Sequence, residues 1–258
     1  MKLKQLTITL ITVCLTIVFG PQAVRAASLT TLADGLNNAR GLSFDSEGNA
    51  YIGETGLGGD GVCQPSPSTQ FELICSGNTG SVTKVTPDGQ QSRVIDGTES
   101  LALQQTKEQG AGPQELQFDS SGTAYLLTGF AGNPANRDTE LNALATNTQF
   151  PPQQQQAAPP VAPDQVLGTT TLGKLYEADL NTGNLTEVAD LSKSELLTNP
   201  DGGDVISNPY DFVIKDNTAY IGDGGANVVW NVNLDTGETT ATKIPGQTVE
   251  NPEFPPNA

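Results

Sequence analysis

Oxygen-bearing side chains recur at one position of an internal repeat. Three versions of one unit lie at residues 41–54 (GLSFDSEGNAYIGE), 115–128 (ELQFDSSGTAYLLT) and 211–223 (DFVIKDNTAYIGD), and they end on Glu54, Thr128 and Asp223. Carboxylate oxygens are ligands that Ca²⁺ prefers, so Glu54 and Asp223 are candidate ligands of a shared calcium ion. The alternative is that each carboxylate caps the end of its own strand by accepting backbone N–H bonds, which is the more usual role there.

Polar residues near the same strand ends are candidates for ligand binding. They lie at the ends of the repeat units, in an Asp-Gly loop and just before the third unit, and the set comprises Glu54, Asp60, Asn208, Tyr210 and Asp223. Neither Asp-Gly loop, 58–61 or 201–204, has the alternating ligand spacing of a calcium-binding loop. Plain turns are therefore the alternative interpretation of both loops.

The residue types also exclude several kinds of chemistry. The 258-residue chain contains no histidine, which removes Ser-His-Asp and Cys-His catalysis and every site with imidazole ligands. A serine nucleophile would then need a lysine base. No motif in the sequence indicates such a pair, so no catalytic residue is assigned. Acid–base chemistry by Asp or Glu stays open. Only 12 basic residues stand against 29 acidic ones, which argues against a nucleic-acid partner.

Residues 1–26 have the pattern of a secretory signal peptide. Lys2 and Lys4 form a positive start, residues 6–19 are an apolar run, and Val24-Arg25-Ala26 offers a cleavage site. An uncleaved anchor is the alternative, although the run is shorter than the roughly 20 apolar residues of a spanning helix. We therefore expect a periplasmic or extracellular protein without membrane contact after cleavage.

Cys63 and Cys75 are expected to form a disulfide. The chain has three cysteines, and Cys14 lies in the predicted signal peptide, so these two remain in an oxidising compartment. Two free thiols are the alternative. A zinc site is disfavoured, because two thiolates without histidine would need carboxylate partners to reach four ligands.

The candidate residues must be positioned by β-structure. Each repeat unit is two short alternating strands around a polar turn, and a second strand pair follows each unit, at residues 81–95, 174–191 and 228–244. Four antiparallel strands per unit form a blade of a β-propeller of the NHL-like kind, so we predict an all-β fold with about three blades over residues 27–246. A β-sandwich of similar hairpins is the alternative.

Two insertions interrupt the blades at the same connection, between the second and third strands. They lie near residues 56–79 and 129–171, and both should cover the same opening. The Pro- and Gln-rich stretch at residues 150–163 predicts an extended loop. A capping box of Ser192 and Glu195, with Leu191 and Leu196 as hydrophobic staple, predicts a helix from Lys193 to about Leu197 that ends at Asn199. Residues 138–145 are a second candidate helix.

Three blades are too few for a closed ring, which typically needs 4 to 8. The Pro-rich tail 247–258 cannot supply four strands, and we interpret it as the start of a missing blade. The expectation is an open arc whose last blade is under-protected around Val228, Trp230 and Val232. The chain would then hide this face by unrecognised strands, close by self-association, or be a truncated gene product.

Several segments together resemble the ScyD/ScyE family of secreted cyanobacterial proteins with propeller-type repeats. They are residues 32–61, the Cys63–Cys75 loop with CSGNTGSVTKV, residues 110–127, NPDGGDVISNPYDF at 199–212 and the closing NPEFPPNA. The family is associated with production of the pigment scytonemin. Members look longer than this chain, and they tend to show Pro-His-Asp where this sequence has Pro113-Gln114-Glu115.

The resemblance implies a secreted pigment-pathway protein that binds, or helps to mature, an aromatic indole–phenol precursor at the inserted-loop face. One alternative is an extracellular propeller without chemistry that scaffolds other secreted pathway proteins. Another is a calcium-dependent lactonase-like hydrolase, which depends on fold analogy and on Glu54 with Asp223. No cofactor is certain, and calcium is the candidate.

Overall fold

Three antiparallel sheets make up the described part of the chain, which in this computed structural model comprises residues 30–66, 71–147 and 165–246. The predicted signal peptide, the stretch 150–163 and the tail 247–258 lie outside the described residues. Within the described part, no helix is long and apolar enough to cross a membrane.

Each sheet is built from strands that follow one another in the chain. The first sheet contains β1 (Ala39–Phe44), β2 (Ala50–Glu54), β4 (Leu73–Val85) and β5 (Gln91–Leu103), with β3 (Cys63–Pro65) paired to β4. The second contains β6 (Pro113–Phe118), β7 (Ala124–Thr128), β8 (Lys174–Asp179) and β9 (Asn184–Asp190). The third contains β10 (Pro209–Lys215), β11 (Thr218–Asp223), β12 (Val228–Asn233) and β13 (Thr239–Lys243). The predicted all-β class is confirmed.

Aspartate side chains organise the hairpin turns that open the first two sheets. In the first, the Asp45 carboxylate accepts the backbone N–H groups of Glu47 and Asn49, each at 2.9 Å, and Gly48 adopts φ +82°. Asp119 does the same in the second turn, accepting the N–H of Ser121 at 2.8 Å. Such Asx turns form locally and leave glycine where φ is positive, which explains the repeated Asp-x-x-Gly pattern.

The register of the first hairpin is the same in all three sheets. Leu42 pairs with Ile52, Leu116 with Leu126, and Phe212 with Ile221. Because side chains alternate along a strand, equivalent residues in the three sheets point the same way relative to their sheet.

Two apolar clusters join the sheets face to face. Tyr51 and Val82 of the first sheet pack with Leu116 and Leu126 of the second, among others. The second and third sheets share a larger cluster, made of Tyr125, Leu127, Leu175, Ala189, Leu191, Phe212, Ala219, Ile221, Ala226, Val228, Trp230, Val232 and Leu234.

The predicted exposure of one face of the third sheet is wrong. Val228 and Val232 have 0% of their surface exposed and Trp230 has 2%, because these side chains point toward the second sheet. The strand alternation was correctly recognised, but the sequence could not tell which of the two faces meets the preceding sheet. The open face is instead the one that carries Val213 and Tyr220, which are 61% and 38% exposed.

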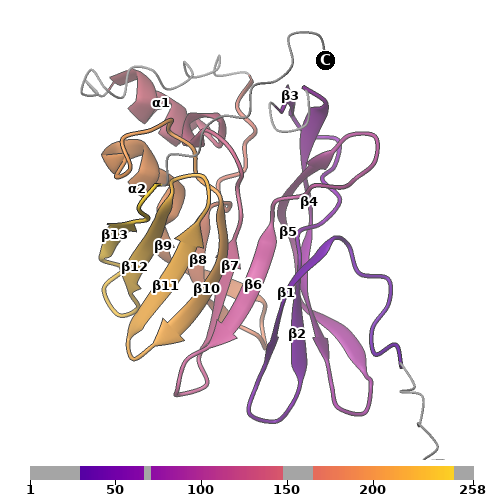
Figure 1. Cartoon of the computed structure of the whole chain (residues 1–258). Helices are drawn as coiled ribbons and strands as arrows, with labels where there is room; N and C mark the ends of the chain where they lie inside the picture. Colours follow the sequence, from indigo (N-terminus) through magenta and orange to yellow (C-terminus); the bar gives the residue numbers. More distant parts are fainter. Residues whose placement is uncertain (1–29, 67–70, 148–164, 247–258) are drawn as a thin grey trace, which may run out of the picture. The chain divides into compact units, whose positions relative to one another are not determined.

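Two short helices lie at the same end of the sheets as β3 (Figure 1). They are α1 (Thr139–Asn147), which follows the 3-10 turn η2 (Pro134–Asn136), and α2 (Leu191–Thr198). Both predicted helices are thus present. Segments of both insertions meet at this end, since Ile74 packs on a cluster that includes Phe130 and Leu167. The described residues of the two insertions therefore contact each other at this end of the sheets.

The predicted capping box of α2 is wrong. Asp190 is the N-cap, and its carboxylate accepts the N–H of Lys193 at 2.9 Å, while Ser192 and Glu195 are fully buried inside the helix. Arg137 from the second insertion binds the Asp190 carboxylate with two bonds of 2.7 and 2.8 Å, which selects this residue as the cap. The predicted end at Asn199, in a left-handed conformation, is confirmed.

Candidate functional site

A cavity of about 510 Å³ lies at the insertion end, between the two insertions and the loops of the third sheet. We call it the loop-face pocket. Its walls are mostly apolar and contain a single charged residue, Asp204, and the lining comprises Gln64, Pro65, Ser66, Ile74, Leu101, Phe130, Ala131, Gly132, Asn133, Asn136, Leu167, Asp204, Val205, Ile206, Asn208, Gly224 and Gly225. An apolar cavity of this size with a few polar groups is typical of a site for a small organic ligand.

One wall of the loop-face pocket is held by the disulfide. The predicted Cys63–Cys75 bond is confirmed, and the two residues lie directly opposite each other across β3 and β4. Gln64 follows Cys63 on β3 and pairs with Ile74 on β4, so the bond fixes to each other the two strands that carry these lining residues.

The facing wall is held by a buried ion-pair network. Arg137 is 1% exposed, and it binds Asp138 at 2.8 Å, Asp190 at 2.7 Å and the carbonyl oxygen of Leu172 at 3.0 Å. The neighbouring Asn136 accepts the N–H of Leu167 at 2.8 Å through its carbonyl. Lining residues from two ends of the second insertion are thereby fixed to one another.

Two amide groups that line the loop-face pocket have unpaired atoms. The Nε2 donor of Gln64 and the Oδ1 acceptor of Asn136 are buried and have no hydrogen-bond partner. Gln64 is only 8% exposed. A buried polar atom without a partner costs about 1–3 kcal/mol, so a ligand that offers one acceptor and one donor would recover part of that free energy.

Glu54 is engaged inside the first sheet. Its carboxylate accepts the backbone N–H of Asn37 at 2.6 Å, the hydroxyl of Thr83, and Arg93 at 3.1 Å. Burial would raise the pKa of Glu54, but these hydrogen bonds, that of Arg93 foremost, hold it below its usual value.

Asp223 is engaged in the same manner inside the third sheet. It accepts the N–H groups of Asn208 at 2.7 Å and of Gly225 and Ala226 at 3.0 Å, together with the hydroxyl of Ser207 and the indole N–H of Trp230. Asp223 therefore ties down the chain after β11, which is the alternative role considered for it, whereas Glu54 holds the segment before β1 and side chains of β4 and β5.

The remaining candidates are dispersed. Asn208 lines the loop-face pocket, and Asp60 is exposed on the first insertion. Tyr210 borders a smaller cavity of about 210 Å³ between β1, β6 and β10. Among the described residues, no three acidic or cysteine side chains gather in a way that could hold a metal ion.

Glu115 and Asp211 form a carboxyl pair that was not predicted. They lie across β6 and β10 beside the smaller cavity, with Arg40 on its rim. Burial, and next the hydrogen bond with Asp211, raise the pKa of Glu115 to about 8, so the Glu115 carboxyl is protonated at neutral pH. The signal was available, because Glu115 and Asp211 open the second and third repeat units at the same position.

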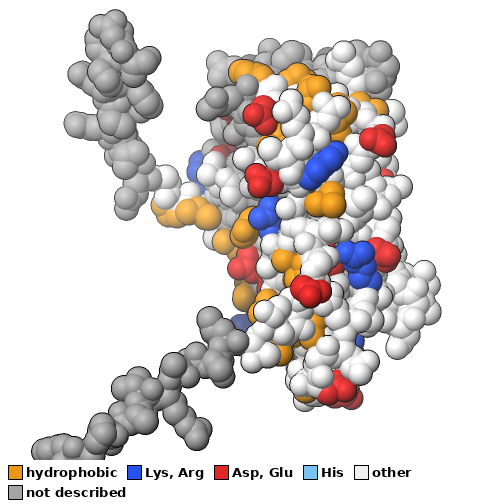
Figure 2. Space-filling model, turned by 90° about the vertical axis from the view of Figure 1, so that its right-hand side faces the viewer, with side chains coloured by type: hydrophobic (Ala, Val, Ile, Leu, Met, Phe, Trp, Pro, Cys, Tyr) orange, Lys and Arg blue, Asp and Glu red, His pale blue; other side chains and the backbone are white. Residues whose placement is uncertain are grey.

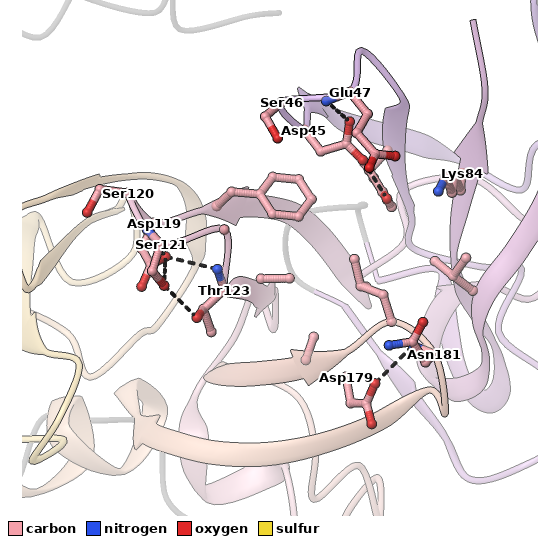
Figure 3. Close-up of a pocket in the computed structure, with 17 residues that line it drawn as sticks. Asp45, Ser46, Glu47, Lys84, Asp119, Ser120, Ser121, Thr123, Asp179 and Asn181 are labelled. Carbon is pink, nitrogen blue, oxygen red and sulfur yellow. Dashed lines mark hydrogen bonds between the residues drawn. The ribbon is translucent and has the colours of Figure 1, made fainter.

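A third cavity, of about 590 Å³, lies between the hairpin turns of the first two sheets (Figure 3). Tyr51 contacts Phe118 edge-on at 5.1 Å between ring centroids, and Lys84 lies over the Tyr51 ring at 5.7 Å. The acidic residues on its rim, among them Asp45 and Asp119, are bonded within their own turns (Figure 3). These carboxylates are accordingly parts of the turns.

No protein-family model matches the chain, and no curated protein matches its sequence.

Proposed function

We propose that this chain is a secreted, propeller-like protein that binds a flat, neutral aromatic molecule of the indole–phenol class in the loop-face pocket. The observation that carries the proposal is the combination of an apolar cavity with the unpaired Gln64 Nε2 and Asn136 Oδ1. An indole or phenol ring fills an apolar pocket, its N–H or O–H can donate to Asn136, and a ring oxygen can accept from Gln64.

The charge of the site favours a neutral ligand. Asp204 is the single charged lining residue and is exposed at the rim, so neither a cation nor an anion would find a buried partner within the described lining. The ScyD/ScyE resemblance supplies the ligand class, a scytonemin precursor, and the predicted signal peptide supplies the location. The three stacked sheets with one hairpin register support the propeller assignment.

The calcium-dependent hydrolase has weaker support, because Glu54 and Asp223 already accept hydrogen bonds from several donors each, in different sheets. For a purely scaffolding role, no feature of the described residues gives more support than the loop-face pocket gives to ligand binding.

Binding is tested by titrating the secreted protein with an indole that carries a 4-hydroxyphenyl ring, followed by calorimetry. The variants Gln64→Leu and Asn136→Leu should each raise the Kd about fivefold, because each loses one hydrogen bond worth about 1 kcal/mol. Gln114→Leu is the matched control, since Gln114 is also buried with an unpaired amide oxygen but lies outside the pocket lining. Absence of binding to the wild-type protein, or equal weakening by all three variants, would contradict the proposal.

Catalysis is tested in the same samples. The absorbance spectrum of the precursor should change over time if the protein helps to mature it, whereas a binding protein shifts the spectrum at once and then leaves it constant.

A further inference from the structure

The two outermost sheets each expose large apolar side chains on one face among the described residues, beside polar neighbours such as Arg93 on the first sheet and Asn231 on the third. On the first sheet Leu42 and Phe44 are 55% and 61% exposed, and on the third Val213 and Tyr220 are 61% and 38% exposed. Figure 2 looks onto the side of the first sheet, where hydrophobic side chains lie among charged and other side chains. We call these two surfaces the leading face (first sheet) and the trailing face (third sheet).

The repeat shows what each face is built to contact. Leu116 and Phe212 occupy the position of Leu42 in the other two sheets, and both are buried against the preceding sheet, at 0% and 2% exposure. Tyr51 and Tyr125 occupy the position of Tyr220, and both are buried against the following sheet, at 4% and 6%. The leading face thus carries the residue types that, in the other two sheets, pack against a preceding sheet.

The two internal contacts also specify a residue pairing. The tyrosine of one sheet lies against the equivalent apolar residue near the end of the first strand of the next sheet: Tyr51 meets the Phe118 ring at 5.1 Å, and Tyr125 shares a cluster with Ile214. Continued by one step, the same rule pairs Tyr220 with a residue equivalent to Phe118 and Ile214. Phe44 holds that position in the first sheet.

We propose that a second copy of this chain covers both faces, with the trailing face of each copy on the leading face of the other. The contact would continue the internal sheet-to-sheet interface, and Tyr220 would pack on Phe44 of the other copy. Two copies related by a two-fold axis make both contacts identical and bring six sheets into one closed ring, within the 4 to 8 of closed propellers.

The oligomeric state of the secreted protein is the primary test. Light scattering after size exclusion should give twice the chain mass, with measurements also at 0.5 M salt to screen the repulsion between two acidic chains. Phe44→Asp and Tyr220→Asp should each weaken the dimer at least tenfold without unfolding the chain, because both side chains are exposed within one copy. Phe71→Asp is the matched control, since Phe71 is 70% exposed but lies next to β4 in the first insertion.

Engineered cysteines test the orientation. Phe44→Cys and Tyr220→Cys proteins, mixed in equal amounts and oxidised, should form a covalent dimer, whereas neither protein alone should do so. A monomeric mass at every concentration, a dimer that resists both aspartate variants, or cross-linking of the Phe44→Cys protein with itself would each overturn the proposal.

Discussion

Glu195 is the most isolated carboxyl group of the described chain. It is fully buried in α2, and neither oxygen has a well-placed hydrogen-bond partner. Burial, and next the repulsion by Asp223 and Asp201, raise its pKa to about 8, although the backbone N–H of Ile206 offsets part of the rise. The group is therefore protonated in the folded protein at neutral pH.

This shift makes stability depend on pH. The folded pKa of Glu195 lies above the value of about 4.3 for an unfolded chain, so its contribution is fully present below about pH 4 and is lost as the pH rises toward 8. Glu195→Gln should remove that loss. The free energy of unfolding of the variant, compared with that of the wild type, should therefore be more favourable at pH 8 than at pH 5 by roughly 1–3 kcal/mol. Urea unfolding at both pH values measures the difference.

Glu238→Gln serves as the control, because Glu238 is exposed. If Glu195→Gln and Glu238→Gln change the pH profile alike, Glu195 is not the group that titrates. Glu115, whose pKa is also raised to about 8, contributes to the profile with the same sign.

The β3–β4 hairpin is the element on which the loop-face pocket depends most directly. Its disulfide joins residues separated by 12 positions, and such a short ring contributes about 3 kcal/mol in the loop-entropy model. Replacing both cysteines by serine should lower the free energy of unfolding by roughly 2–3 kcal/mol. It should also raise the Kd of the aromatic ligand, because Gln64 follows Cys63 on β3. Urea unfolding and calorimetry measure the two effects.

Reduction of the wild-type protein by a thiol reagent should reproduce both effects and leave the double-serine variant unchanged. Full alkylation of the secreted protein without prior reduction would contradict the disulfide itself.

The helices show how far local patterns extend. Asp190, Ser192 and the turn at Asn199 all lie within one short segment, and the presence and end of α2 could be predicted from them. The choice of Asp190 over Ser192 as the cap depends on Arg137, which is 53 residues away in the sequence. No local pattern contains that contact.

The stacking of the sheets is tested through the single tryptophan. Trp230 is buried between the second and third sheets and donates to Asp223 at 3.1 Å, so its emission reports on that contact. Leu127→Ala, on the facing surface of the second sheet, should cost about 2–5 kcal/mol of unfolding free energy. Denaturant unfolding followed by Trp230 emission measures the loss.

Leu197→Ala is the matched control, because Leu197 is 44% exposed on α2, and it should cost less than about 1 kcal/mol. A Leu127→Ala protein that unfolds at the wild-type midpoint would show that this contact does not carry the stability of the stacked sheets.

The sequence by itself predicted four strands and their turns in each sheet, but not β3 of the first sheet. Alternating side chains and Asx turns act over a few residues, so the repeat was visible without a structure, as was the pairing of the two cysteines left after the predicted signal peptide. The roles of Glu54 and Asp223 could be narrowed to two alternatives but not decided, because the donors that surround each carboxylate come partly from distant segments.

Only the tertiary structure decided which faces are buried and where a ligand could bind. The burial of Val228, Trp230 and Val232 follows from which face of the third sheet packs on the second sheet, and a period-2 pattern does not contain that choice. The loop-face pocket joins residues as far apart as Gln64 and Gly225. The cavity and its unpaired amides could not be predicted from the sequence, because the disulfide and the Arg137 network bring its lining segments together through long-range contacts.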